Sequence, residues 1–388
     1  MSLAVSICAD AQKETVKINP RPATTTIQPK AKPKVKPESK DSQKKNNQKK
    51  QEMPDPTPKA ISDNQIPNQF EQGGLSFVIM DRPKREVTLS DGKIFSGNVE
   101  IPSTVVYGGV TFTITAVGGF AFDGCDNITA ITIPSTVKEI GSFAFENCSS
   151  LTSVTIPNSV KKIGSGAFFG CSALKSVIIP ASVTTIEDSA FAGCSSLTSV
   201  IVPGSVTEIG NYVFNNCTSL TTATLPASIT RIGENMFQGC GNLTEINMPP
   251  TITEIGSNAF GFCRSLREIK LPESLVTIGV SAFANCSGLT SVNIPSKVKT
   301  IGKDAFNDCR NLARVTLPES LTAIGVRAFY NCRSLPTIYI PNSVTELGVE
   351  AFYGCEKLGS VSLPKSFKKI RKEVFGADFK SIKFSFLK

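Results

Sequence analysis

The chain has 388 residues, contains no histidine and no tryptophan, and carries a formal net charge of +9. The lack of histidine excludes histidine-based catalytic triads and removes the most common general base and metal ligand of proteins. No apolar run approaches the roughly 18–20 residues that a membrane-spanning helix needs, so the sequence predicts no transmembrane segment.

The N-terminus, MSLAVSICADAQ, is mostly apolar and ends in the small-x-small pattern Ala9-Asp10-Ala11. This pattern is typical of the end of a secretory signal peptide, although the basic region that normally precedes the apolar stretch is missing. We therefore expect residues 1–11 to be a truncated signal peptide. A disordered apolar N-terminus is the alternative.

Residues 12–72 are rich in Lys, Pro, Gln, Asn, Ser and Thr, as in QPKAKPKVKPESKDSQKKNNQKKQ, and carry most of the net positive charge. Such a segment cannot bury enough apolar surface to offset chain entropy, and alternating Pro and Lys extends it. It predicts a disordered linker. A second reading is that Lys30, Lys32, Lys34 and Lys36 bind an anionic surface. The segment has no aromatic residues between its lysines, so nothing in it predicts sequence-specific binding of nucleic acid.

Residues 73–388 are predicted to form one repeat solenoid, because residue types recur every 23 positions without insertion. Prolines keep this interval from Pro134 to Pro364, and phenylalanines keep it from Phe122 to Phe375. The interval is clearest in eleven cysteines: Cys125, Cys148, Cys171, Cys194, Cys217, Cys240, Cys263, Cys286, Cys309, Cys332 and Cys355.

Each unit begins with a predicted strand. The alternation of Leu151, Val154 and Ile156 indicates one buried side, and Pro157 ends the strand because it has no N–H for the ladder. Gly164 is then expected to permit a turn. A single unit has too few apolar side chains to offset its ordering entropy, so neighbouring units must stack.

The cysteines have three candidate roles: disulfides, metal ligands or core residues. Stacked coils would place equivalent Cβ atoms about 4.7–4.9 Å apart, which is wide for a disulfide, whose Cβ atoms prefer about 3.8 Å. No C-x₂-C pair offers the clustered ligands that zinc needs. We therefore expect a structural column of buried thiols, with no metal and no cofactor.

The unit C-x-x-L-x-x-V-x-I-P-x-S-V-x-x-I-G-x-x-A-F-x-x-C resembles the 23-residue leucine-rich repeat of the bacterial BspA-like family. The resemblance implies an α/β repeat solenoid. This would be a right-handed curved array with short parallel strands on the concave face and turns and short helical segments on the convex face. It also implies a lengthened first repeat at about 97–124, eleven cysteine-marked units and a C-terminal cap at about 371–388. Glu187 and Arg371 depart from the pattern, because each replaces the turn glycine.

The same resemblance implies a non-enzymatic protein, secreted or displayed on a bacterial cell surface, that acts in adhesion, coaggregation or binding of host matrix proteins. The residues agree with a binding role. Carboxylates such as those of Glu245 and Glu268 are expected on an open surface, where nothing shifts their pKa towards catalysis.

Outward-facing strand positions form the predicted binding surface of the concave face. Most of these positions hold Ser or Thr, and the charged, amide and aromatic exceptions cluster in neighbouring units: Glu245, Asn247, Arg267, Glu268, Lys270, Asn293, Arg314 and Tyr339. Such a patch offers anchoring contacts for a protein or glycan ligand, on host matrix or another cell surface.

Three alternatives remain for this surface and for the array. The patch residues can be ordinary solvated side chains on drifting repeats. The solenoid can be a structural spacer or a self-association module whose end strands pair. Lastly, the basic N-terminal segment can be a polyanion-binding surface anchor, with the solenoid passive.

Overall fold

The computed structural model describes residues 62, 65–92, 95–376 and 380–387. The chain divides into a unit of Met1–Pro56, which lies entirely outside these residues, and a unit of Thr57–Lys388. The predicted signal peptide and most of the predicted linker therefore lie outside the described residues. The prediction of a disordered linker up to residue 72 is wrong at its end, because Gln69–Gln72 form strand β1 and Phe70 is buried. No helix among the described residues is long and apolar enough to cross a membrane.

The N-terminal end of the second unit is built from antiparallel strands. β1 (Gln69–Gln72), β2 (Leu75–Asp81) and β3 (Glu86–Asp91) pair in order, and β5 (Thr104–Tyr107) forms a hairpin with β6 (Val110–Val117). The glycine pairs between β1 and β2 and between β5 and β6 all have positive φ, as two-residue hairpin loops require. Buried Phe70 packs on Phe77 and Phe112.

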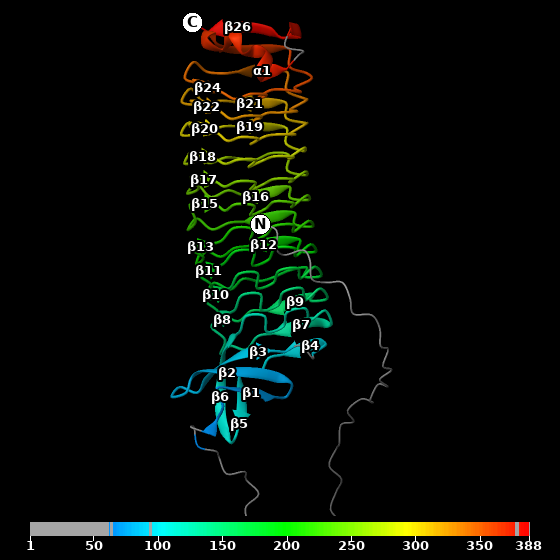
Figure 1. Ribbon diagram of the computed structural model, residues 1–388, viewed down its shortest axis with the longest axis vertical. Helices are drawn as coiled ribbons and strands as arrows, with labels where there is room; N and C mark the ends of the chain where they lie inside the picture. The colour runs from blue at the N-terminus through cyan, green and yellow to red at the C-terminus, as the bar shows by residue number, and fades with distance from the viewer. Residues whose placement is uncertain (1–61, 63–64, 93–94, 377–379, 388) are drawn as a thin grey trace, which may run out of the picture. The chain divides into compact units, whose positions relative to one another are not determined.

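The repeated coils follow, and each contributes a strand to one or both of two parallel columns (Figure 1). We call the first column the strand face. It consists of β4 (Gly97–Glu100), β7 (Ile128–Thr132), β9 (Ser153–Thr155), β12 (Ser199–Ile201), β14 (Thr222–Thr224), β16 (Glu245–Asn247), β19 (Ser291–Asn293), β21 (Arg314–Thr316), β23 (Thr337–Tyr339), β25 (Ser360–Pro364) and β26 (Lys383–Leu387).

The other column, which we call the second face, is made of two-residue strands. They are β8 (Glu139–Ile140), β10 (Lys162–Ile163), β11 (Thr185–Ile186), β13 (Glu208–Ile209), β15 (Arg231–Ile232), β17 (Glu254–Ile255), β18 (Thr277–Ile278), β20 (Thr300–Ile301), β22 (Ala323–Ile324) and β24 (Glu346–Leu347). Paired residues are 23 positions apart, for example Lys162 and Thr185. The fold is a parallel-strand solenoid with a constant register.

Helix is nearly absent from the array, so the short helical segments expected on its outer side are not found. Residues 95–364 contain none, and η2 (Lys365–Lys369) and α1 (Arg371–Phe375) lie near the C-terminal end. The reason is that turn residues such as Tyr212 and Asn216 have positive φ, which interrupts a right-handed helix. Peptide groups of these turns form hydrogen bonds between coils instead. One example is the bond from the Phe168 N–H to the Ala190 carbonyl (2.8 Å).

Twelve phenylalanines, spaced 23 residues apart from Phe122 to Phe375, form a continuous stack through the core. Neighbouring ring centroids are 5.2–5.9 Å apart and the rings are inclined by 3–17°. Eleven of the twelve are almost fully buried, and Phe375 is 5% exposed. The ring of each inner coil therefore stacks on the rings of both neighbouring coils, which couples the stabilities of the units.

The cysteines lie beside this stack. All eleven are buried and unbridged, and the ten from Cys148 to Cys355 each donate their thiol to the carbonyl of the Phe 26 residues earlier, at 3.0–3.3 Å. The column of small buried residues predicted from the sequence is confirmed. The hydrogen bond donated by the thiol was not predicted. It explains why a weak donor suits this position better than a methyl group.

Burial makes the eight thiols from Cys194 to Cys355 poor acids. Desolvation raises the pKa of Cys194, Cys240, Cys286 and Cys355 to about 12, and raises the pKa of Cys217 well above its usual value. Because the thiolate is the reactive form, the ladder is chemically inert while the coils remain closed.

We expect the eleven ladder thiols of the folded protein to resist a thiol reagent at mildly alkaline pH and to react once guanidinium unfolds the array. Folding raises the pKa of the eight thiols from Cys194 to Cys355, so it favours their protonated form. That contribution to stability is complete below the unfolded pKa of about 8.5. It is lost as the pH rises towards about 12.

The urea midpoint should therefore fall over this alkaline range. Rapid reaction of several thiols in the folded protein, judged by alkylation and peptide mass spectrometry, would contradict the prediction. Cys8 lies outside the described residues and is assigned separately in the peptide map.

The glycine column has a different role from the one expected. Gly164 does not have positive φ, so the turn itself tolerates other residues. A Cβ at Gly164 would instead lie 2.7 Å from backbone atoms of Gly141 and Ser142 in the preceding coil. Glycine is needed there because the backbones of successive coils approach closely.

Candidate functional site

The predicted patch lies on the strand face, and all eight of its side chains are exposed. Glu245 and Asn247 are the two ends of β16, Asn293 ends β19, Arg314 begins β21 and Tyr339 ends β23. The remaining three, Arg267, Glu268 and Lys270, belong to a coil without a named strand, joined to β19 only by a bridge between Glu268 and Ser291.

The backbone ladder of the strand face is interrupted at this coil. Thr244 N–H donates to the Thr221 carbonyl (2.9 Å), and Thr290 N–H donates to the Arg267 carbonyl (3.0 Å). Among the described residues there is no such bond from Arg267 N–H to the Thr244 carbonyl. A hollow of about 280 Å³ lies beside the interruption, lined by Glu268, Ile269, Lys270, Leu271, Ser291 and Asn293.

The structure thus brings Glu268, Lys270 and Asn293 together at one hollow. Arg267 neighbours this group along the chain, and Glu245 and Asn247 lie on the preceding coil. Arg314 pairs in register with Ser291. Tyr339 is one coil further away, where burial and then the nearby carboxylate of Glu319 raise the pKa of its phenol.

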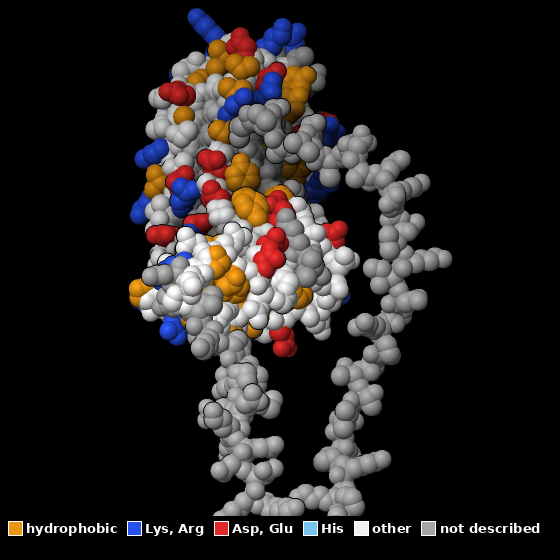
Figure 2. Space-filling model, turned by 60° about the horizontal axis from the view of Figure 1, so that its bottom comes forward, with side chains coloured by type: hydrophobic (Ala, Val, Ile, Leu, Met, Phe, Trp, Pro, Cys, Tyr) orange, Lys and Arg blue, Asp and Glu red, His pale blue; other side chains and the backbone are white. Residues whose placement is uncertain are grey.

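The charged side chains of the patch are available to a partner. Seven ion pairs join described residues, and none of them includes Glu245, Arg267, Glu268, Lys270 or Arg314. Figure 2 shows charged and hydrophobic side chains interspersed over the surface in view, without a large area of one kind. A ligand of this patch would therefore meet mixed, unneutralised charges.

Several hydroxyls of the strand face hold the coils together. The hydroxyl of Thr152 donates to the Thr129 carbonyl (2.9 Å), and that of Thr221 donates to the Thr198 carbonyl (2.9 Å). These threonine hydroxyls therefore stabilise the stack of coils, whereas the charged side chains of the patch do not take part in such bonds among the described residues. Nearby, Ile178 and Ile201 are 83% and 69% exposed, and they form a small apolar spot on the same face.

A second site, on the second face, was not predicted from the sequence. It is a groove of about 610 Å³ that crosses four successive coils. Its lining includes Ser165, Glu187, Asp188, Thr207, Glu208, Ile209, Asn211, Thr230 and Arg231. The short-strand ladder is interrupted here, because β13 and β15 do not pair. The one signal in the sequence was Glu187, which interrupts the glycine column just before the opening.

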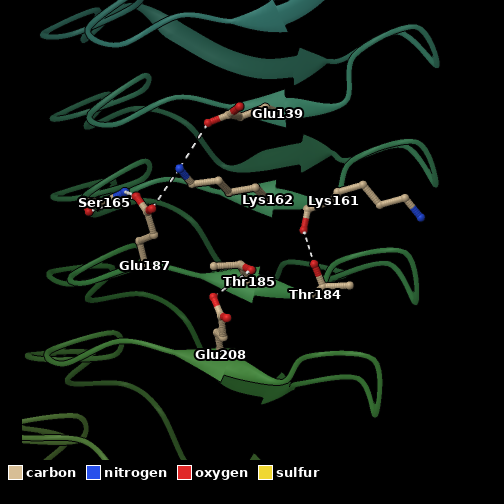
Figure 3. Close-up of polar contacts among 8 residues, drawn as sticks. All are labelled: Glu139, Lys161, Lys162, Ser165, Thr184, Thr185, Glu187 and Glu208. Atoms are coloured by element: carbon tan, nitrogen blue, oxygen red, sulfur yellow. Dashed lines mark hydrogen bonds and ion pairs between the residues drawn. The ribbon is translucent and has the colours of Figure 1, made fainter.

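Ion pairs fix one end of this groove (Figure 3). The Lys162 ammonium lies 2.8 Å from a Glu187 carboxylate oxygen and 3.3 Å from Glu139. The other Glu187 oxygen accepts the N–H and hydroxyl of Ser165 at 3.0 and 3.1 Å. The hydrogen bond with Glu187 raises the pKa of Lys162, and Lys162 lowers the pKa of Glu187. Three coils are thereby held together.

Neither site resembles a catalytic centre. No group of three or more His, Cys, Asp and Glu side chains within the described parts of the chain could hold a metal ion. The eleven ladder cysteines are buried, so they offer no accessible nucleophile. Both sites are open surfaces built from charged groups, amides and hydroxyls, which suits binding.

Comparison with known proteins gives a consistent result. The pattern described as a BspA type leucine rich repeat region (6 copies) matches residues 109–221, 169–290 and 276–387. No curated protein shows a match.

Two solved bacterial structures are similar over most of the chain. A leucine-rich repeat protein from Bacteroides ovatus is 32% identical, covers 82% of this chain and 100% of its own, and has a TM-score of 0.52. A leucine rich cell surface protein from Faecalibacterium prausnitzii is 30% identical, covers 84% of this chain and 97% of its own, and has a TM-score of 0.57. The pneumococcal vaccine antigen PcpA, at 21% identity and a TM-score of 0.51, shares the fold.

Proposed function

Because this chain belongs to the BspA-type leucine-rich repeat family, we propose that it is a secreted or cell-surface binding protein that recognises a protein or glycan through the strand face. In this proposal residues 1–11 direct export, and the part of the predicted linker that precedes β1 presents the array. The cell-surface description of the Faecalibacterium prausnitzii relative supports the location. The absence of any metal-binding cluster among the described residues fits a role in binding.

The observation that carries the proposal is the coincidence of charge and backbone interruption around Glu268 and Lys270. Elsewhere on this face, outward side chains are largely Ser and Thr, and several of their hydroxyls bond to the preceding coil. At the patch, charges outside any ion pair of the described residues surround a hollow next to a coil whose ladder bond to the preceding coil is missing. Exposed charges and open peptide groups together offer directional contacts to a partner.

The triple variant Arg267→Ala, Glu268→Ala, Lys270→Ala is expected to weaken ligand binding about tenfold or more, because loss of central anchors dominates interface energies. Binding would be measured on immobilised matrix proteins and bacterial surface polymers. The matched control is Lys297→Ala, Lys299→Ala, Glu346→Ala, which also removes two cations and one anion from exposed positions.

Equal binding by the patch variant and the control would reject the patch as the site. Concentration-dependent oligomers without any foreign ligand would instead favour self-association. Deletion of residues 12–61 leaves β1 and the buried Phe70 in place. Binding that is lost on this deletion, and that high salt also abolishes, would favour the basic segment as the anchor.

A further inference from the structure

The groove on the second face contains two missing hydrogen bonds of the ladder. Gly210 N–H donates to the Ile186 carbonyl and Gly256 N–H donates to the Ile232 carbonyl, both at 2.9 Å. Between these coils, Gly233 N–H and the Ile209 carbonyl have no partner within the described residues. The same holds for Thr230 N–H and the Thr207 carbonyl.

Leaving these groups unpaired is costly, since Gly233 is a buried residue and buried peptide groups in native proteins are almost always hydrogen-bonded. Each missing bond leaves a donor facing an acceptor across a narrow opening. A hydroxyl or a water can bridge such a pair, because one oxygen both accepts and donates.

The opening is a wedge and does not have the width of a strand. Phe214 and Phe237, the core rings of the two coils that the opening separates, are 5.6 Å apart, compared with 5.2 Å for Phe145 and Phe168 three coils earlier. An inserted strand would need about another 4.8 Å between the coils. The occupant must therefore lie over the opening and reach in with small polar groups.

The floor and rim of the groove suit a polyhydroxylated ring. Ile209 is only partly buried, whereas its counterparts Ile186 and Ile232 are buried, so an aliphatic surface is open to the ligand. The carboxylates of Asp188 and Glu208 are in no ion pair among the described residues. The Arg231 guanidinium donates to the Asn211 side-chain carbonyl (2.7 Å) beside them.

We propose that this groove is a second binding site, for a neutral oligosaccharide. Two sugar hydroxyls bridge the donors and acceptors of the missing ladder bonds, Ile209 packs against the C–H face of a ring, and Asp188 and Glu208 accept hydrogen bonds from further hydroxyls. A groove of about 610 Å³ across four coils accommodates several sugar units. The site is independent of the patch on the strand face.

The test is binding of the full chain to an array of neutral hexasaccharides of glucose, mannose, xylose and N-acetylglucosamine. Asp188→Asn with Glu208→Gln is expected to weaken the binding about tenfold or more, because bonds to charged acceptors are stronger than bonds to neutral ones. Glu254→Gln with Glu346→Gln is the control. It changes the same column position as Glu208 where the ladder is intact, and it should leave affinity unchanged.

Two further readouts separate this site from the strand-face patch. Saccharide should slow hydrogen exchange at the Thr230 and Gly233 amides. Saccharide should leave exchange unchanged at the Thr290 amide, which bonds to the Arg267 carbonyl on the strand face. No saccharide binding on the array would overturn the proposal, as would equal losses in the groove variant and its control. Salt-sensitive capture of basic peptides in place of sugars would also overturn it.

Discussion

Replacing Phe260 by alanine is expected to lower the free energy of unfolding by about 3–5 kcal/mol. Its ring is fully buried and stacks on Phe237 at 5.6 Å and on Phe283 at 5.2 Å. The truncation leaves a cavity in the middle of the stack. Because each coil contacts only its two neighbours, the loss falls on both interfaces at once and divides the array into two weaker halves.

The control is Phe262→Ala, two residues along the same coil. Phe262 is 38% exposed, and its principal aromatic contact is with the Arg264 guanidinium, 5.9 Å from the ring centre. We expect a change below about 1 kcal/mol there. Urea unfolding followed by circular dichroism gives the energies, and hydrogen exchange of the coils on either side shows where protection is lost. Equal destabilisation by the two substitutions would show that the stack is not the main source of coupling.

The repeat interval was sufficient to predict the inward columns. Phe168, Cys171 and Ile163 are buried as their spacing indicated, because a residue that recurs at every turn of a stack has the same environment each time. The thiol donor bond to the Phe carbonyl could not be foreseen, since it depends on the detailed path of the turn. The second column of strands was also missed, because two residues are too few to show an alternating pattern.

The eight patch residues are exposed, although Arg267, Glu268 and Lys270 belong to no named strand, and the interruptions of the ladder were not predicted. One interruption has a cause that is visible in the sequence. Pro336 has no N–H at the position where Ala313 donates to the Thr290 carbonyl (2.8 Å), and β21 and β23 do not pair. The others depend on changes of a few tenths of an ångström in coil spacing, which residue types alone do not determine.

Glu187 shows how the array responds to a side chain in the glycine column. Its N–H still donates to the Ile163 carbonyl (2.9 Å), so its own coil stays paired. The spacing of the core rings then widens from 5.3 Å at Phe168 and Phe191 to 5.9 Å at the next pair. The groove crosses these coils, and its missing ladder bonds lie one coil further on, between Ile209 and Gly233. A departure from the repeat can therefore open the surface without breaking the fold.

Gly348→Ala is expected to destabilise the array by about 1–3 kcal/mol, as overpacking of a closed interior does. A Cβ there would lie 2.3 Å from Val326 N and 2.4 Å from the Gly325 carbonyl carbon. Both are backbone atoms and cannot rotate away. Since φ at Gly348 is not positive, the cost is steric and comes from the contact between coils.

Gly241→Ala is the matched control, because a Cβ there meets nothing within 4 Å and its φ is likewise not positive. That substitution should be neutral or slightly stabilising, since alanine reduces the entropy of the unfolded chain. In the Gly348 variant we expect faster amide exchange at residue 348, whose N–H bonds to the Ile324 carbonyl (2.8 Å). A Gly348 variant as stable as the unchanged protein would show that the coils can separate at little cost. The wedge beside Glu187 would then need a different explanation.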